Sequence, residues 1–139
     1  MVANVADEPP QERLLARPFT ARDLPRLRVA TEEHANRAGL VEPRLGDFVF
    51  AVSEVAANAV EHAGGGTLLL YRNDQGLECR ISDCGPGFTE AAIPQLAPGI
   101  DGAPGAGRGL WLARLVTDHL SVRPGPVVGA VVTLVMHLR

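Results

Sequence analysis

The sequence predicts an α/β two-layer sandwich, in which a mostly antiparallel, mixed β-sheet carries helices on one face. Segments with a 3.6-residue apolar period and short strand-like segments follow in the order strand, helix, helix, hairpin, long loop, helix, hairpin. Hairpins make antiparallel neighbours, and helices with one apolar face need a sheet on which to bury it. The 139 residues are enough for one core. We therefore predict a flexible tail over residues 1–12 and a single domain over residues 13–139.

The first predicted elements are an edge strand and a helix. The strand runs from Leu14 to Phe19. Thr20 and Asp23 can both cap the N-terminus of a helix. Apolar residues then recur at helical spacing as far as Gly39, and glycine is typical of the position just after a helix.

The second predicted helix, from about Pro43 to His62, carries the most informative pattern of the chain. Glu54, Asn58 and His62 follow one another at a spacing of four, which places them on one helix face. This polar stripe lies away from the main apolar stripe, although apolar residues flank it. Buried polar groups are costly when they are unpaired. The stripe therefore needs a partner, which is either another part of the protein or a bound ion or nucleotide.

The rest of the chain predicts two hairpins and a third helix around a long loop. Glycines 64–66 end the second helix, and strands over 67–71 and 77–82 are joined by a turn at 73–76. Residues 83–108 are rich in Gly and Pro, with a short helix possible at 90–96, and loops of this length are usually functional or mobile. The third helix spans 109–119, with Leu112, Leu115 and Val116 facing inward, and a hairpin over 120–138 closes the sheet.

Composition and charge exclude several classes of protein. The net charge is −3, and all 13 basic residues are arginines, so a nucleic-acid-binding protein is not expected. P-loop proteins and eukaryotic-type protein kinases each need a lysine at the phosphates, and this chain has none. No apolar run reaches the ~18 residues of a membrane span. With no signal-peptide core in residues 1–10, and with Cys79 and Cys84 as reduced thiols, we expect a cytoplasmic protein without membrane contact.

Three motifs could build a site, although each of them alone also has a structural explanation. Glu54 and Asn58 can form a structural hydrogen bond. Residues 83–87 (Asp-Cys-Gly-Pro-Gly) can be an ordinary turn at a strand end. Residues 105–110 (Gly-Ala-Gly-Arg-Gly-Leu) lead into a helix, where glycines let the backbone approach a ligand and the helix N-terminus attracts anions. A glycine-rich lead into a helix also occurs without a ligand, and this spacing is not the Rossmann fingerprint.

Together, in this order and spacing, the motifs resemble those of the GHKL superfamily of ATP-binding domains, which includes gyrase, histidine kinases and MutL. Within it, the chain is most similar to the small stand-alone anti-sigma-factor serine/threonine kinases of bacteria. The likeness runs from about Thr20 to the C-terminus. Residues 52–63 resemble the N box, 83–88 the first glycine box and 105–110 the second, with the ATP lid between the glycine boxes. The resemblance implies the Bergerat-type, histidine-kinase-like ATPase fold.

The resemblance also implies a role for each residue of the motifs. Asn58 would hold Mg²⁺ through its amide oxygen, and Glu54 would be the catalytic general base on the attacking hydroxyl. Asp83 would accept a hydrogen bond from the adenine amino group. Backbone N–H groups of the second glycine box would wrap the phosphates, helped by the charge of Arg108. The ATP-binding residues implied in this way are Asn58, His62, Asp83, Gly85, Gly87, Gly105, Gly107, Arg108, Gly109 and Leu110. A helix-end histidine packed on the sheet explains His62 equally well.

Two features depart from the family's pattern. Its last strand often starts Gly-Thr, with the threonine near the phosphates, whereas this chain has Gly129-Ala130. Thr133 is out of register, which puts one phosphate contact in doubt. The lid also lacks the Phe-rich box of sensor histidine kinases, so histidine autokinase activity is not expected.

The function implied by the resemblance is an ATP- and Mg²⁺-dependent serine/threonine kinase. It would phosphorylate an antagonist protein, bind an RNA polymerase sigma factor and act as a homodimer. The alternative is a regulatory module that binds ATP and a protein partner without transferring phosphate. The first helix, around Leu27 to His34, is a candidate dimer or partner surface, although helix amphipathicity explains its pattern equally well.

Overall fold

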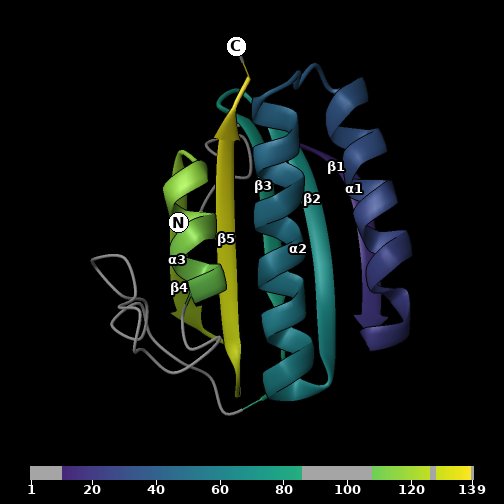
Figure 1. Ribbon diagram of the computed structural model, residues 1–139, viewed down its shortest axis with the longest axis vertical. Coiled ribbons are helices and arrows are strands. Elements are labelled where there is room, and N and C mark those ends of the chain that lie inside the picture. Colours follow the sequence, from purple (N-terminus) through teal and green to yellow (C-terminus); the bar gives the residue numbers. More distant parts are fainter. Residues whose placement is uncertain (1–10, 86–107, 126–127, 139) are drawn as a thin grey trace, which may run out of the picture.

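The computed structural model describes residues 11–85, 108–125 and 128–138, and it shows one five-stranded sheet with three helices on one face (Figure 1). The elements in chain order are β1 (Gln11–Thr20), the 3₁₀ turn η2 (Ala21–Asp23), α1 (Leu24–Arg37), α2 (Arg44–Ala63), β2 (Gly65–Asn73), β3 (Gly76–Ser82), α3 (Arg108–Val116), β4 (His119–Pro124) and β5 (Ala130–His137). No helix among these is long and apolar enough to cross a membrane.

The strand order is β1-β2-β3-β5-β4, and all four pairings are antiparallel. The predicted two-layer α/β sandwich is therefore confirmed, and within the described residues its sheet is wholly antiparallel rather than mixed. The order places β3 and β5 side by side, although the whole of α3 and β4 separates them in the sequence. The C-terminal end of β3 and the N-terminal end of β5 consequently lie side by side at the same end of the sheet, where Ser82 pairs with Val131.

The helices cover the face of the sheet that carries the buried side chains. Along β3, Leu77, Cys79 and Ile81 are buried while the residues between them are half-buried, which is the period-2 alternation of a sheet with one covered face. Alternate residues of β5 from Ala130 to Met136 are also buried, and Thr133 between them is buried as well. Burial, and secondarily the negative charge of Glu78, raises the pKa of the Cys79 thiol far above its usual range.

α2 is the central helix of the covering layer, with α1 on one side and α3 on the other (Figure 1). It packs on β2, β3 and β5 and buries Phe48, Val52 and Val55 against them. Gly64 ends it in the left-handed conformation, with φ of 79°, which favours glycine because a Cβ atom would strain there. The predicted span of this helix, Pro43 to His62, agrees with the observed one to within one residue at each end.

Several other elements differ from their predicted bounds, and β2, for example, spans Gly65–Asn73 rather than residues 67–71. β1 begins at Gln11 rather than Leu14, because its first residues pair with the end of β2. α3 ends at Val116 rather than at His119, and its inward face was predicted only in part: Val116 packs against the core as predicted, but Leu115 is 64% exposed, and Leu110 and Ala113 are buried instead. The short helix considered at residues 90–96 lies outside the described residues.

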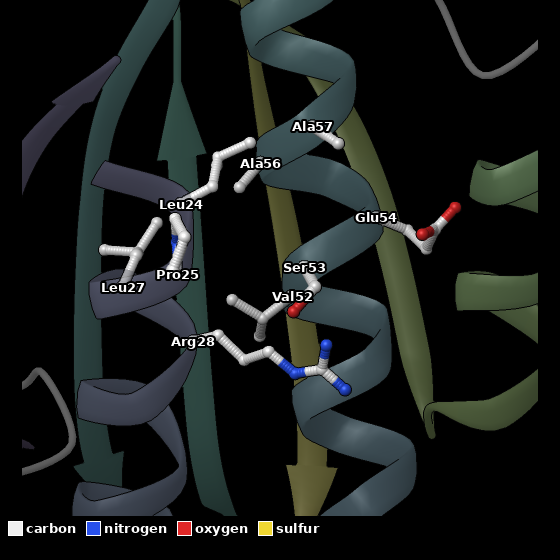
Figure 2. Close-up of a pocket in the computed structure, with 9 residues that line it drawn as sticks. All are labelled: Leu24, Pro25, Leu27, Arg28, Val52, Ser53, Glu54, Ala56 and Ala57. Atoms are coloured by element: carbon white, nitrogen blue, oxygen red, sulfur yellow. The ribbon is translucent and has the colours of Figure 1, made fainter. Parts of the chain in front are cut away.

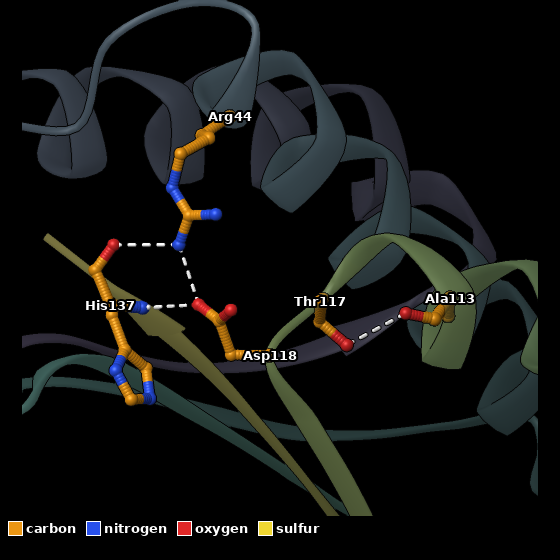
Figure 3. Close-up of polar contacts among 5 residues, drawn as sticks. All are labelled: Arg44, Ala113, Thr117, Asp118 and His137. Atoms are coloured by element: carbon orange, nitrogen blue, oxygen red, sulfur yellow. Dashed lines mark hydrogen bonds and ion pairs between the residues drawn. The ribbon is translucent and has the colours of Figure 1, made fainter. Parts of the chain in front are cut away.

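A polar cluster fixes the C-terminal end of α3 to the start of α2 and the end of β5 (Figure 3). Oδ2 of Asp118 accepts hydrogen bonds from the Arg44 guanidinium at 2.5 Å and from the backbone N–H of His137 at 2.7 Å. Arg44 also donates to the carbonyl oxygen of His137 at 2.8 Å. Partial burial acts to raise the pKa of Asp118, but the hydrogen bonds from His137 and Arg44 and their charges outweigh it and hold the pKa below its usual range. We refer to Arg44, Asp118 and His137 as the Arg44 cluster.

Candidate functional site

Glu54, the first residue of the polar stripe of α2, faces α3 rather than open solvent. Figure 2 shows the carboxylate of Glu54 pointing away from α1, toward the neighbouring helix on the other side of α2. Glu54 and Asn58 are half-buried, and His62 at the end of the helix is exposed. None of the three side chains has a hydrogen bond or ion pair that involves the described residues. Two oxygen-bearing side chains, one turn apart and partly removed from water, are thus left without a protein partner there.

The first turn of α3 lies directly against Glu54. A Cβ atom placed on Gly109 would overlap Oε1 of Glu54 and lie 3.3 Å from its Cδ. Only glycine therefore allows the start of α3 to approach the carboxylate this closely without a shift of the Glu54 side chain. The first backbone N–H groups of a helix have no partner within it and point outward, so this end of α3 is a place for an anion beside Glu54.

The end of β3 supplies the third part of the site. Asp83 follows β3 directly, and its backbone N–H donates to the carbonyl oxygen of Ala130 at 3.1 Å. Its Oδ1 accepts from the N–H of Gly85 at 2.9 Å, while Oδ2 has no partner among the described residues. Gly85 packs on the last turn of α2, because a Cβ there would lie 2.8 Å from Cβ of Ala63 and 2.9 Å from the carbonyl oxygen of His62. The chain after β3 is thus pressed onto the same helix that carries Glu54 and Asn58.

The sequence comparisons agree with this arrangement. The pattern of the histidine kinase-like ATPase domain family matches residues 17–136, which is most of the chain. The chain belongs to the histidine kinase-like ATPase domain family. The search of curated proteins found no match. Membership in the family implies that the domain binds ATP, and it makes ATP-dependent phosphotransfer the general class of activity.

The described residues of this ATPase domain fit ATP well. Oδ2 of Asp83 has no partner among the described residues and is an acceptor of the kind that an exocyclic amino group needs, and the glycines at 85 and 109 let the chain on either side of the site approach α2 closely. The described residues contain no group of three or more His, Cys, Asp or Glu side chains that could hold a metal alone. An amide or carboxylate oxygen from α2 together with nucleotide phosphates is, however, the donor set that Mg²⁺ prefers, so the site suits an ion that arrives with the nucleotide.

The structure places the other predicted site residues as follows. Leu110 is only 6% exposed and points its side chain into the core, so only its backbone is available to a phosphate. Arg108 is the first residue of α3. His62 is exposed, so the alternative of a histidine packed on the sheet is wrong; its carbonyl oxygen lies near Gly85. Gly87, Gly105 and Gly107 lie outside the described residues.

One residue with a part in the site was missed as a site residue. Gly129 has φ of 87°, and a Cβ on it would overlap the carbonyl oxygen of Asp83. It therefore lets the start of β5 support Asp83. Its position inside the strand predicted over residues 127–138 could have been read as a signal for such a close approach, because a glycine within a strand often marks a place where two backbones meet.

Ala130, which stands where the family often has threonine, has no side-chain hydroxyl group to offer a ligand. Ala130 is fully buried and faces the helices, so its side chain packs in the core. Thr133 is three residues further along β5 and lies on the opposite face of the sheet, because side chains alternate along a strand. It therefore cannot replace a threonine at position 130 as a contact for a nucleotide bound on α2.

Proposed function

We propose that this ATPase domain is a serine/threonine protein kinase of the anti-sigma-factor type. The observation that supports the proposal most directly is the placement of Glu54. Its carboxylate has no partner among the described residues, and it lies against the N-terminal turn of α3, where the phosphates of a nucleotide find unpaired N–H groups. An unpaired carboxylate at that point can accept the proton that a hydroxyl group loses during phosphoryl transfer.

In the proposed reaction, the γ-phosphoryl group passes from ATP to the hydroxyl oxygen of a serine or threonine, the bond between its phosphorus and the bridging oxygen breaks, and ADP leaves. Glu54 takes the proton that this hydroxyl loses. Asn58 holds Mg²⁺, which supplies positive charge at the phosphates. Asp83 accepts a hydrogen bond from the adenine amino group and so sets the position of the nucleotide along α2. The N–H groups of the first turn of α3 hold the phosphates in line with the attacking oxygen.

The proposed partners are proteins. The phosphate acceptor is a small antagonist protein, and the kinase sequesters an RNA polymerase sigma factor until the antagonist displaces it. We propose that the kinase acts as a homodimer. The apolar and charged residues of α1 remain the candidate partner surface, since Val29 there is 55% exposed while Leu27 and Ala30 are buried.

The test is phosphate transfer from labelled ATP to the antagonist encoded nearest to this chain's gene, in the presence of Mg²⁺. We expect label on a serine or threonine of the antagonist. We also expect Glu54→Gln, which keeps the shape of the side chain but cannot accept the proton, to lower the transfer rate by at least about a hundredfold while ATP still binds. Glu61→Gln is the matched control, because Glu61 is an exposed carboxylate on the same helix. A Glu54→Gln protein that transfers phosphate at the wild-type rate would exclude Glu54 as the base.

A second candidate function is a nucleotide-binding module that does not transfer phosphate. The observation that favours it is Ala130, whose buried side chain offers the phosphates nothing. The outcome that distinguishes this candidate is saturable ATP binding without label on any protein. Absence of ATP binding at millimolar ATP·Mg²⁺ would contradict both candidates.

A further inference from the structure

A pocket of about 420 Å³ lies between α1 and α2, on the side of α2 away from the ATP site (Figure 2). It exists because α2 carries small side chains where it faces α1, so that the space between the two helices is not filled. Its volume falls in the range of small-molecule sites, roughly 300–1,000 Å³. The residues that decide its chemistry are Leu24, Leu27, Arg28, Ser53, Ala56 and Ala57.

The walls of the pocket are apolar, and Arg28 is the charged group directed at it. Figure 2 shows the guanidinium of Arg28 reaching across from α1 toward α2, beside Ser53. Glu54 also contributes to the lining, but its carboxylate points to the opposite side of α2. Arg28 makes no ion pair or hydrogen bond that involves the described residues. The pocket thus combines an apolar surface with a cationic group that no described residue pairs with, and a ligand with a negative charge could pair with it.

Ser53 contributes an acceptor and no free donor. Its hydroxyl group donates its one proton to the carbonyl oxygen of Val49 at 2.8 Å. The pocket therefore offers a ligand the guanidinium of Arg28, the lone pairs of the Ser53 hydroxyl group and an otherwise apolar surface. A ligand with several charges or many polar groups would leave most of them without a partner on entering, and this is unfavourable.

We propose that this pocket binds a small amphipathic carboxylate. Its apolar chain lies between α1 and α2 against Leu24, Leu27 and Ala56, and its carboxylate pairs with Arg28. Arginine and a carboxylate match in charge and in planar, two-pronged geometry, and their hydrogen bonds are stronger than those between neutral groups. The proposal does not depend on the proposed kinase function, because Asn58 and His62 do not line the pocket and the carboxylate of Glu54 points to the opposite side of α2.

The test uses octanoate as the probe and the whole protein. Calorimetry and amide chemical shifts on titration with millimolar octanoate should show binding that perturbs residues of α1 and α2. Each methylene added across a series from hexanoate to decanoate should tighten binding roughly fourfold until the chain outgrows the pocket. Octanol, which has the same chain length without the charge, should bind at least about tenfold more weakly.

Two variants make the test specific. Arg28→Gln should weaken octanoate binding at least about tenfold and leave octanol binding unchanged. Arg26→Gln is its control, because Arg26 is exposed on the same helix and does not line the pocket. Ala57→Leu should fill the pocket from an exposed helix position that tolerates leucine, and it should abolish binding of both probes.

Three results would overturn the proposal. The first is wild-type protein that shows neither heat nor shift changes with millimolar octanoate. The second is an Arg28→Gln protein that binds octanoate as tightly as the wild type does. The third is a set of shift changes that falls outside α1 and α2, since octanoate would then occupy another part of the surface.

Discussion

Asn58 presents an amide oxygen one turn from the Glu54 carboxylate, and its side chain has no partner among the described residues. Replacing it with alanine removes a proposed Mg²⁺ ligand but should leave α2 intact, because alanine is the best helix former and the asparagine is only half-buried. We expect Asn58→Ala to weaken the binding of ATP·Mg²⁺ at least about tenfold. The free energy of unfolding should change by less than about 1 kcal/mol. Calorimetry and urea denaturation measure the two effects.

The matched control for this substitution is Asn36→Ala. Asn36 is an exposed asparagine on α1, so its replacement has the same intrinsic effect on a helix without touching the site. It should leave ATP·Mg²⁺ binding unchanged. If Asn58→Ala bound ATP·Mg²⁺ as tightly as the wild type does, Asn58 would have no place in the metal site.

The two cysteines provide a second prediction for single residues. Cys79 is buried, and burial raises the pKa of its thiol and keeps it protonated. Cys84, between Asp83 and Gly85, is exposed. We expect a thiol reagent at mildly alkaline pH to modify one cysteine rapidly in the folded protein and two in denaturant. Saturating ATP should slow the rapid reaction, because Cys84 adjoins the proposed adenine contact. Cys84→Ser should lose the rapid phase, and two rapid thiols in the folded wild type would be inconsistent with the burial of Cys79.

Among the elements, α2 was predicted well and α3 was not, for a physical reason. α2 is long and strongly periodic, so its apolar face and polar stripe are both visible in the sequence. α3 has nine residues with leucines on several sides, and its contact with α2 decides which of them are buried. Asp118, two residues after the end of α3, binds the distant Arg44 and His137 through its carboxylate. No local pattern shows a contact of that kind.

The contact between α2 and α3 at Gly109 should be more important for chemistry than for folding. Alanine at 109 suits a helix better than glycine does by about 1 kcal/mol, and the atoms it meets belong to the flexible end of Glu54. Gly109→Ala should therefore fold with nearly unchanged stability but displace the carboxylate. Because misplacement of a reacting group by about 1 Å can cost roughly a hundredfold in rate, we expect phosphate transfer to fall by about tenfold to a hundredfold.

Gly46→Ala is a close control for Gly109→Ala. Gly46 is also a helical glycine, and a Cβ there would lie 2.9 Å from the side-chain oxygen of another glutamate, Glu42. It lies in the first turn of α2, more than two turns before Glu54. Gly46→Ala should transfer phosphate at the wild-type rate, measured with the same labelled ATP. Equal losses in both variants would mean that the effect at Gly109 is not specific to the site.

The Arg44 cluster holds the other end of α3, and its contribution to stability can be measured. Asp118→Asn keeps the size of the side chain but removes the charge that two donors share. Both Arg44 and Asp118 are about one-third exposed, so solvent screens the pair, and we expect a loss of about 1 kcal/mol in the free energy of unfolding at neutral pH. Asp74→Asn, at an exposed carboxylate in the β2–β3 turn, should change it by less than about 0.5 kcal/mol. A loss equally small for Asp118→Asn would show that the cluster does not stabilise the fold.

For the whole molecule, Asp118 should make the free energy of unfolding fall as the pH is lowered in the acidic range. The folded protein holds the pKa of Asp118 below its usual range, so the unfolded chain binds the proton more readily. The resulting stabilisation is fully present above the unfolded pKa of about 3.9 and is lost as pH falls through the lower, folded value. Urea denaturation of wild type and Asp118→Asn should therefore differ by a constant amount above about pH 5, and the difference should shrink below about pH 4. A difference that stayed constant down to the lowest accessible pH would exclude this carboxylate as its source.

The assembly of the site could be predicted from the sequence only in part. The three motifs are visible as residue types, and the spacing of Glu54 and Asn58 already places them on one helix face. Their meeting depends on the strand order, which puts the end of β3 beside the start of β5 and thereby sets Asp83 against Gly129. The pocket at Arg28 was not predicted at all, since it arises from the distance between two helices rather than from any motif.

The two glycines that pack on α2 have a consequence for how the domain can vary. Gly85 lies against Ala63 and Gly109 lies against Glu54, so both ends of the connection between β3 and α3 rest on one helix, about 13 Å apart along its axis. A chain fixed at both ends on one rigid support can change in length without altering the geometry of its attachment. Insertions or deletions between residues 85 and 108 should therefore leave the sheet and the contacts of Gly85 and Gly109 with α2 in place.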